Sequence, residues 1–556
     1  MKRKNNVLSL LEEKTVFYNE KTALSIKDNY GWKEFSYKGL GLMSRRIAYH
    51  LIEELHVKKG EKCAILSESK PEYGACVFAS IISGMTAVPL DIKLTVFELN
   101  SILNDCEPTI MFVSEHYANT AIELQKKIPS IKKILVIDEH CKNVGLENIY
   151  NLPEKYETKW KLRSSNSTAF IIYTSGTTGA PKGVEITFNN MMSQLEDLKI
   201  ALENILPKKE INVLSILPMN HLFEMTVGFS TFLNFGFSVY YTHSLKPKDI
   251  LGIMRDKKIE FMIVVPAFLK LLKSAIENEL NKSPKSTQLL FKATYHFAKF
   301  IPFYSVKKIL FKKIHDKFGG RFIGCISGGA PLDIDVGRFF ERIGLKVYQG
   351  YGLSETSPVV SVNYDKRHVL ASVGKPLQHF EARIDSETGE LQLKGPSVMK
   401  GYHNQPELTA QTIDEDGWLH TGDIAKFDKD GHIYITGRIK NMIVLSGGKK
   451  VFPEEVEAVL EKSKYITESC VFGHSRDFGT KDGTESIVAV VVPTEQLYED
   501  NDEKTVEDIV KKDIKQQCQR LTPYKRPIDI IVRKDALPRT TTRKVKRKEV
   551  ISTVTL

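Results

Sequence analysis

The strongest constraint on the fold is an alternation of short apolar runs with longer amphipathic stretches over roughly the first 435 residues. Most of the runs are apolar throughout, as strands are when helices cover both faces of a parallel sheet. This pattern predicts an α/β fold. The strand candidates are KCAILSE (62–68), TAVPLD (86–91), TIMFVSE (109–115), KILVIDE (133–139), AFIIYTSG (169–176), NVLSILP (212–218), FSVYYTH (237–243) and FMIVVPA (261–267).

The pattern changes in the last third of the chain. From about Gly374, EARIDSETGELQLKGPSV and GHIYITGRI alternate polar and apolar residues around turn pairs, which predicts an antiparallel β subdomain. The stretches PEEVEAVLEKS, SIVAVVVPT, VEDIVKKDIKQQCQRL and PIDIIVRKDAL then predict a compact α+β domain. Because 556 residues are too many for one hydrophobic core, we expect a large domain over 1–437 and a small one over 438–556.

A stretch rich in glycine and hydroxyl groups directly follows one of the apolar runs. It reads IIYTSGTTGAPKGVEIT and covers residues 171–187. Its small side chains let a ligand approach the backbone closely, and its N–H groups can point at an anion. Lys182 adds a full positive charge. The spacing differs from that of the usual P-loop, so we expect a phosphate site of another kind.

The segment YQGYGLSETSP, residues 348–358, carries several groups suited to nucleotide chemistry. The Glu355 carboxylate can ligate Mg²⁺ through oxygen. The Thr356 hydroxyl can hydrogen-bond a phosphate, and the Tyr351 ring can stack on a base. A glycine turn of this kind is common, so the segment carries weight only together with the others.

Two further segments add a ring site and a ribose site. SGGAPL, residues 327–332, is a glycine turn after a strand candidate and suits the close approach of a flat ring. GWLHTGD, residues 417–423, places Asp423 after a glycine, where its carboxylate can accept hydrogen bonds from two ribose hydroxyls.

In this order along the chain, the segments resemble the adenylate-forming family of acyl-CoA synthetases, peptide-synthetase adenylation domains and luciferases. Two later segments complete the resemblance, GRIKNMIVLSGGKKVFPEEVE (437–457) and LPRTTTRKVKRKEV (537–550). It runs from about residue 20 to 550. The resemblance implies a two-step reaction: a carboxylate attacks the α-phosphate of ATP to give an acyl-adenylate and pyrophosphate, and a thiol then displaces AMP. Such phosphate chemistry needs positioning and charge rather than a protein nucleophile.

The resemblance also assigns roles to the matching residues. Lys544 would bridge the attacking carboxylate and the α-phosphate, Glu355 would bind Mg²⁺, and Thr356 would contact the α-phosphate. Lys440 matches the hinge about which the small domain rotates, and Gly447 and Gly448 would face the thiol tunnel. The implied ATP-binding residues are Thr174, Ser175, Gly176, Thr177, Thr178, Gly179 and Lys182 at the β- and γ-phosphates, Gly328, Gly329, Ala330, Tyr351 and Gly352 around adenine, and Asp423 and Arg438 at the ribose.

One position departs from the family. A glycine commonly precedes the final lysine, and Arg543 stands there in this chain. Arg543, Lys546, Arg547 and Lys548 surround Lys544, so which cation enters the site stays open.

The acyl substrate is indicated by LPMNHLFEM, residues 217–225, which resembles the segment that lines the acyl entrance. His221 and Phe223 would lie beside the carboxylate, although an ordinary loop histidine is the other interpretation of His221. We expect an ATP-dependent long-chain fatty acid–CoA ligase that uses Mg²⁺. The alternatives are an acyl-[acyl carrier protein] synthetase and a luciferase-like adenylating oxygenase.

The net charge and the cysteines limit which partners and which cellular compartment we expect. The net charge of +11 favours anionic partners such as ATP, coenzyme A, a carrier protein or anionic lipid, and the resemblance implies no nucleic acid. The seven cysteines form no CxxC pair, and the N-terminal stretch lacks the apolar core of a signal peptide. We therefore expect a cytoplasmic protein. Two uncharged stretches, 73–90 and 225–245, predict a buried helix, a glycine turn and a buried strand rather than a spanning helix.

Residues 270–321 contain twelve lysines or arginines against three acids, with apolar residues between them. This composition is compatible with an amphipathic segment that meets a membrane surface. It is equally compatible with a solvated pair of helices packed on the core. The sequence leaves both interpretations open.

Overall fold

The structure is a computed structural model in which the chain divides into two compact units. The first consists of Met1–Glu381 and Leu393–Leu419, and the second of Ala382–Gln392 and His420–Leu556. The boundary predicted at 437/438 lies inside the second unit, and where the chain hinges stays a prediction. The residues described are 6–28, 31–142, 145–174, 181–364, 368–445, 449–475, 485–499, 501–539 and 545–554.

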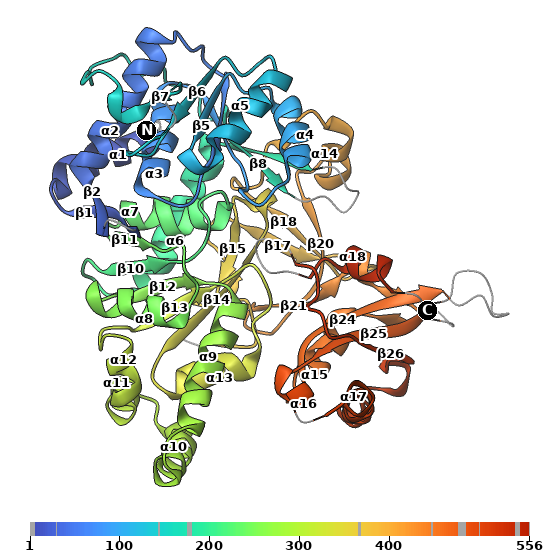
Figure 1. Cartoon of the computed structure of the whole chain (residues 1–556). Helices are drawn as coiled ribbons and strands as arrows, with labels where there is room; N and C mark the ends of the chain where they lie inside the picture. The colour runs from blue at the N-terminus through green and yellow to red at the C-terminus, as the bar shows by residue number, and fades with distance from the viewer. Residues whose placement is uncertain are drawn as a thin grey trace. The chain divides into compact units, whose positions relative to one another are not determined.

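Among the described residues, the first unit is built on two large sheets (Figure 1). The eight-stranded sheet has the order β19-β9-β8-β4-β3-β5-β6-β7. The pairs from β8 to β7 are parallel, whereas β8–β9 and β9–β19 are antiparallel. Its strands are β3 (Lys62–Leu66), β4 (Thr86–Pro89), β5 (Ile110–Val113), β6 (Lys133–Val136), β7 (Glu147–Asn148), β8 (Thr168–Thr174), β9 (Lys182–Thr187) and β19 (Gly401–Tyr402).

The nine-stranded sheet has the order β16-β15-β14-β13-β12-β10-β11-β1-β2. The pairs from β14 to β1 are parallel, and the three pairs at the two edges are antiparallel. Its strands are β1 (Thr22–Asp28), β2 (Gly31–Ser36), β10 (Asn212–Ser215), β11 (Ser238–Tyr241), β12 (Phe261–Val264), β13 (Gly324–Ser327), β14 (Lys346–Gly352), β15 (Val359–Val362) and β16 (Lys375–Pro376).

Helices cover these sheets. The α-helices of the first unit are α1 (Asn6–Tyr18), α2 (Tyr37–Tyr49), α3 (Pro71–Ile82), α4 (Val96–Cys106), α5 (Ala118–Lys127), α6 (Phe188–Ile205), α7 (Phe232–Asn234), α8 (Pro247–Asp256), α9 (Pro266–Asn281), α10 (Lys285–Phe297), α11 (Tyr304–Leu310), α12 (Lys312–Lys317), α13 (Ile334–Arg342) and α14 (Pro406–Thr412). The shorter turns are η1 (His50–Glu54) and η4 (Glu224–Thr231), which are π-helical, and the 3₁₀ segments η2 (Glu115–Tyr117), η3 (Ile149–Asn151), η5 (Ala298–Phe300) and η6 (Ser354–Thr356).

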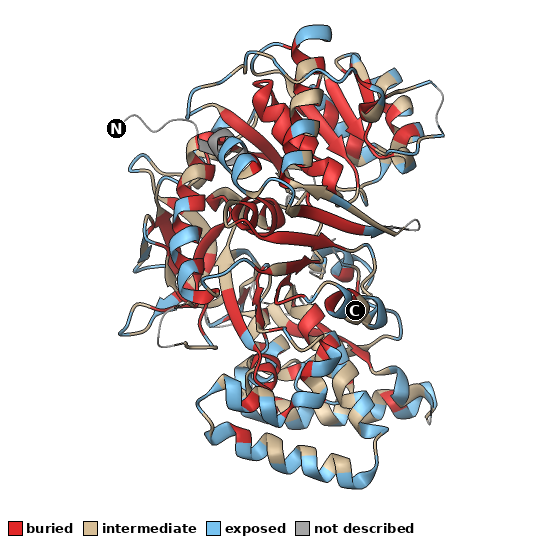
Figure 2. Cartoon of the chain, turned by 90° about the vertical axis from the view of Figure 1, so that its left-hand side faces the viewer, coloured by how far each residue is buried: buried red, intermediate tan, exposed pale blue. Residues whose placement is uncertain are grey.

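The structure confirms the predicted strands. The central strands are apolar because they are buried on both faces. Every residue of β4, β5, β11, β12 and β13 is buried, and Figure 2 shows many strands in the colour of buried residues. Local signals set the helix starts. Thr95 and Glu98 form a capping box that begins α4, and Thr187 and Asn190 form one that begins α6.

The two uncharged stretches fold as predicted. The first forms α3, a turn with Gly84 at φ +71°, and β4. The second forms η4 and α7, a turn with Gly236 at φ +76°, and β11. The sequence did not predict the π-helical geometry of η4. In the described part of the chain, no helix combines the length and apolar composition that crossing a membrane requires.

The second unit also contains the β elements predicted after Gly374. The four-stranded sheet has the order β17-β18-β20-β21, and the three-stranded sheet the order β24-β25-β26. Their strands are β17 (Glu381–Ile384), β18 (Glu390–Lys394), β20 (Leu419–Phe427), β21 (Ile433–Arg438), β24 (Ile466–Ser475), β25 (Glu485–Pro493) and β26 (Asp529–Val532); β22 (Ile443–Val444) pairs with β23 (Lys450–Val451). The helices are η7 (Ile439–Asn441), α15 (Pro453–Leu460), α16 (Glu495–Glu499), α17 (Glu503–Gln517), η8 (Cys518–Arg520), η9 (Pro523–Lys525) and α18 (Arg547–Ser552).

Candidate active site

The glycine-rich stretch connects two antiparallel strands rather than a strand and a helix. Thr174 ends β8 and pairs in register with Lys182, which begins β9. Both side chains are half-buried. Ser175, Gly176, Thr177, Thr178 and Gly179 lie outside the described residues. The backbone pairing places Lys182 beside Thr174, at the end of the apolar strand.

Lys182, Tyr402 and Glu355 come together although they lie far apart in the sequence. The Lys182 Nζ atom is 5.5 Å from the centroid of the Tyr402 ring. The Tyr402 hydroxyl donates a hydrogen bond of 2.9 Å to Glu355 Oε1. Burial, together with the adjacent Glu355 carboxylate, raises the pKa of Tyr402, so this hydroxyl keeps its proton. A cation, a hydrogen-bond donor and a carboxylate therefore share one location.

Tyr402 is a residue that the sequence analysis did not single out. It lies on β19, which pairs with β9, the strand that follows the glycine-rich stretch. Its neighbours hold it there, because His403 Nδ1 and Lys400 Nζ each lie 2.7 Å from the Glu185 carboxylate of β9. Burial would raise the pKa of Glu185, but the hydrogen bonds from His403, Lys400 and Thr168 outweigh it and lower the pKa to about 2. A two-residue strand carries no pattern from which this contact could be predicted.

The loop that carries Glu355 depends on a close backbone approach. A Cβ atom on Gly352 would lie 1.7 Å from the Pro358 carbonyl oxygen. Thr356 is fully buried, and its hydroxyl lies 2.9 and 3.0 Å from the carbonyl oxygens of Leu353 and Pro358, either of which can accept its one hydrogen. The same hydroxyl accepts a hydrogen bond of 3.0 Å from the Leu353 N–H. The phosphate contact expected of Thr356 stays a prediction, but this geometry does not favour it. Ser354, in the same turn, is only half-buried.

The SGGA turn follows β13 and meets the predicted acyl segment. A Cβ atom on Gly328 would lie 3.0 Å from the Phe223 ring, so this ring already packs against the glycine backbone. Gly329 has φ +82° and is exposed, and Ala330 is half-buried. The turn therefore offers an open backbone surface next to Phe223.

His221 lies in the middle of that acyl segment. Its N–H donates to the Pro218 carbonyl at 3.0 Å, and the Met219 N–H donates to Ser69 Oγ at 2.9 Å, which anchors the loop. The His221 ring is half-buried.

Glu224 follows three residues later and is fully buried, a feature that no motif indicated. Its carboxyl is hydrogen-bonded by Ser215, and Tyr241, also fully buried, neighbours it. Burial raises the pKa of Glu224 to about 8. The carboxyl is therefore neutral over most of the physiological range, which removes the cost of burying a charge in η4.

In the second unit, Asp423 and Arg438 occupy paired positions on β20 and β21. Arg438 Nε lies 2.6 Å from Asp423 Oδ1, and Asp423 is only 2% exposed. The structure thus pairs the two residues predicted at the ribose. Lys440 is exposed in η7. Gly447, Gly448 and Lys544 lie outside the described residues.

The cations around position 544 have different partners. Arg547 bonds Glu457 and lies 3.5 Å from Glu454. Lys546 pairs with Glu549 at 2.7 Å. Because Lys546 and Arg547 already pair with carboxylates of the second unit, fewer cations near position 544 compete for the site.

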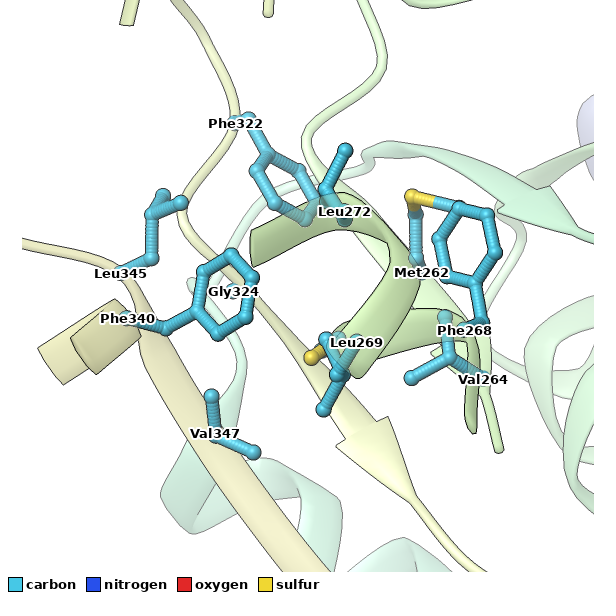
Figure 3. A pocket seen from close by; sticks show the side chains of 11 residues that line it. Met262, Val264, Phe268, Leu269, Leu272, Phe322, Gly324, Phe340, Leu345 and Val347 are labelled. Atoms are coloured by element: carbon cyan, nitrogen blue, oxygen red, sulfur yellow. The ribbon is translucent and has the colours of Figure 1, made fainter. Parts of the chain in front are cut away.

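A small apolar cavity lies between the nine-stranded sheet and α9 (Figure 3). Its volume is about 10 Å³, roughly that of one water molecule. The side chains of Met262, Val264, Leu269, Phe340 and Val347 line it. An acyl chain does not fit there without rearrangement of this core.

Two models of known protein families match this chain. A model of the AMP-binding enzyme family matches residues 11–403. A model of the AMP-binding enzyme C-terminal domain matches residues 455–544. The first match alone covers more than half of the chain.

Several curated proteins are similar to this chain over most of its length. The long-chain-fatty-acid–CoA ligase FadD15 of Mycobacterium bovis is 28% identical, over 76% of this chain and 73% of its own. The long-chain-fatty-acid–CoA ligase of Salmonella typhimurium is 28% identical, over 98% and 94%. Luciferin 4-monooxygenase of Photuris pensylvanica is 28% identical, over 80% and 78%. The relatives thus include two of the three enzyme types that the sequence left open, the CoA ligase and the luciferase.

Solved structures share the whole fold. An ATP-bound RpMatB-BxBclM chimera superposes with a TM-score of 0.80 at 25% identity and covers 98% of both chains. The o-succinylbenzoate CoA synthetase MenE of Bacillus subtilis, in complex with its acyl-adenylate, superposes with a TM-score of 0.74 at 23% identity and covers 97% of both chains. The predicted fold class and family resemblance are confirmed: this chain belongs to the AMP-binding family of adenylate-forming enzymes, within the ligase superfamily.

Proposed function

We propose that this protein activates a long-chain fatty acid with ATP, through an acyl-adenylate, and transfers the acyl group to coenzyme A. The observation that carries the proposal is the convergence of Lys182, Tyr402 and Glu355 beside the β8–β9 turn. ATP and a carboxylate are both anions, so their reaction requires cationic groups and a metal ion at this location.

The proposed roles follow from the chemistry of each group. Lys182 and the turn it closes hold the β- and γ-phosphates. Glu355 would hold Mg²⁺. Tyr402 hydrogen-bonds one oxygen of this carboxylate, and the other oxygen can ligate a hard cation. Bound Mg²⁺ would neutralise phosphate charge. Ser354 is a better-placed hydroxyl for the α-phosphate than Thr356, whose hydroxyl is used inside the turn.

Other candidate residues complete the proposed ATP and acyl sites. Gly328, Gly329 and Tyr351 would flank adenine, with Asp423 and Arg438 at the ribose. His221 and Phe223 would lie at the acyl carboxylate, and the Phe223–Gly328 contact supports this, since it joins the acyl segment to the adenine turn. The names of two relatives support a long-chain acid.

The proposal is tested by pyrophosphate release with acids from acetate to stearate, each with and without coenzyme A. We expect release to be greatest with long chains and acyl-CoA to form only when coenzyme A is present. The Glu355→Gln variant serves as the control for ATP-dependent signal.

Two other outcomes would replace the proposal. Acyl transfer to an acyl carrier protein, with none to coenzyme A, would make the enzyme an acyl-[acyl carrier protein] synthetase. Oxygen consumption after adenylation, independent of any thiol, would favour the oxygenase chemistry named for the Photuris relative. Preference for a short or aromatic acid would leave the adenylation chemistry in place and overturn the substrate class.

A further inference from the structure

A group of short helices extends from the first unit beyond α9 and α13. It consists of α10, η5 and α11, and Figure 1 shows α10 as its outermost part. The inner side packs on the core, because the Phe291 ring lies 5.7 Å from the ring of Tyr295 and 5.6 Å from that of Phe311. Figure 2 shows that most of the remaining surface is exposed.

The exposed side of this group is unusually apolar. Of the twenty large apolar side chains that are exposed in the described part of the chain, eight fall between residues 289 and 310. They are Leu289 (71% exposed), Leu290 (68%), Phe297 (62%), Phe300 (68%), Phe303 (66%), Val306 (41%), Ile309 (74%) and Leu310 (43%). Single exposed apolar residues are ordinary, but such a cluster marks an interaction surface. We call these eight residues the apolar face.

Lysines border the apolar face on one side. Lys285, Lys292 and Lys299 recur every seven residues and are all exposed. At about 100° per residue, they lie along one edge of α10 and η5, whereas Leu290, Phe297 and Phe300 occupy the adjacent outward arc. The long alkyl chain of lysine lets an apolar face enter a lipid interface while the ammonium groups stay at the headgroups.

No acid offsets this charge locally. Residues 280–315 contain eight lysines and no aspartate or glutamate. Lys312 and Lys317 pair with Asp316 and Glu279 just outside that range. Among the described carboxylates, none forms an ion pair with Lys285, Lys292 or Lys299. The row of Lys285, Lys292 and Lys299 beside the apolar face therefore keeps its positive charge.

We propose that the apolar face and its lysine border bind the surface of an anionic lipid bilayer. Apolar side chains next to a row of lysines are the composition of helices that lie in a membrane interface. A second copy of the chain fits less well, because a two-fold interface would place the same lysines against each other. The inference does not depend on the acyl specificity proposed above, and its test uses neither ATP nor a fatty acid.

The experiment is sedimentation of the full-length protein with vesicles of phosphatidylcholine alone or with phosphatidylglycerol. We expect binding to the anionic vesicles at low salt, and most of it to be lost at about 1 M salt, where the Debye length is about 3 Å. The triple variant Lys285→Gln/Lys292→Gln/Lys299→Gln should bind roughly 100-fold more weakly. The double variant Phe297→Ser/Phe300→Ser should lose roughly 10-fold or more.

Matched controls separate this surface from general charge and apolarity. Lys504→Gln/Lys512→Gln/Lys515→Gln removes three exposed lysines from α17. Phe17→Ser/Phe97→Ser removes two aromatic rings that are 77% and 83% exposed. Both controls should bind anionic vesicles as the wild type does, and all variants should keep the wild-type unfolding temperature.

Three results would overturn the proposal. The first is a wild type that ignores anionic vesicles at low salt. The second is equal loss of binding in the α10 variants and in the α17 control, because net charge alone would then explain it. The third is a concentration-dependent dimer, seen by sedimentation velocity, that Phe297→Ser/Phe300→Ser abolishes, since a second copy would then cover the face.

Discussion

Glu355 and Tyr402 form the contact on which the proposed metal site depends. If the Tyr402 hydroxyl orients the Glu355 carboxylate, Tyr402→Phe should leave that carboxylate less well positioned for Mg²⁺. Loss of a group that orients a metal ligand typically costs 10- to 100-fold in metal affinity or activity. We therefore expect Tyr402→Phe to raise the Mg²⁺ concentration needed for half-maximal pyrophosphate release roughly 10-fold, and Glu355→Gln to raise it further.

Tyr49→Phe is the matched control, because Tyr49 lies on α2 and has no assigned role. It should show the wild-type Mg²⁺ dependence. An unchanged Mg²⁺ requirement in both Tyr402→Phe and Glu355→Gln would remove the metal role from this carboxylate, even if the maximal rate fell.

Glu224 predicts a pH dependence of stability. Its pKa is about 8 in the folded chain because it is buried, against an ordinary value of 4.5. Between these values the folded state binds more protons than the unfolded state, so stability is fully present below pH 4.5 and is lost as the pH rises towards 8. One proton gives a slope of about 1.4 kcal/mol per pH unit at most.

Glu224→Gln keeps the shape of this side chain and removes its titration. The free energy of unfolding of the first unit can be measured in urea at pH 5.5, 7 and 8.5. We expect this free energy to fall more with rising pH in the wild type than in the variant. Parallel curves for the two proteins would show that Glu224 is ionised in the fold at all three pH values.

At the scale of elements, a close backbone approach forms the turn between β14 and η6. A Cβ atom on Gly352 would overlap the Pro358 carbonyl oxygen, so Gly352→Ala forces the turn that carries Glu355 to shift. We expect a loss of roughly 1–3 kcal/mol in unfolding free energy and a large loss of pyrophosphate release.

Gly252→Ala in α8 is the matched control, since nothing lies within 4 Å of its added Cβ. A helix interior favours alanine, so this variant should gain about 0.5–1 kcal/mol and keep full activity. Wild-type activity in Gly352→Ala would mean that the turn is not part of the catalytic site.

For the whole molecule, we propose that the small domain takes two orientations, one for each step of the reaction. We propose that Lys544 acts in adenylation and that Lys440 lies at the hinge. Lys544→Ala should then slow adenylate formation roughly 100-fold or more. Conversion of supplied acyl-adenylate to thioester should be affected much less, because that step uses the other orientation.

Lys534→Ala is the control, because Lys534 is exposed in the second unit and is not among the cations that surround Lys544. Both half-reactions should proceed normally in it. Equal loss of both half-reactions in Lys544→Ala, measured separately, would contradict the assignment.

The secondary-structure elements and the family could be predicted from the amino-acid sequence. Strands such as β5 and β12 were predictable because a strand buried on both faces must be apolar throughout. Gly236 and Gly84 were predictable as turns because only glycine adopts their positive φ without strain. The order of the motifs then indicated the family, which the family models confirmed.

Which side chains meet and which face solvent could be read from the folded chain alone. Tyr402 reaches Glu355 through a short strand that pairs with β9, and nothing near residue 402 in the sequence announces a contact 47 residues away. The Thr356 hydroxyl was a plausible phosphate ligand by type, yet the fold buries it in its own turn. Leu290 and Phe291 are adjacent apolar residues; the first is exposed and the second packs on the core. The type of a side chain sets its possible chemistry. Strand pairing and burial set its contacts, and these depend on residues that are distant in the chain.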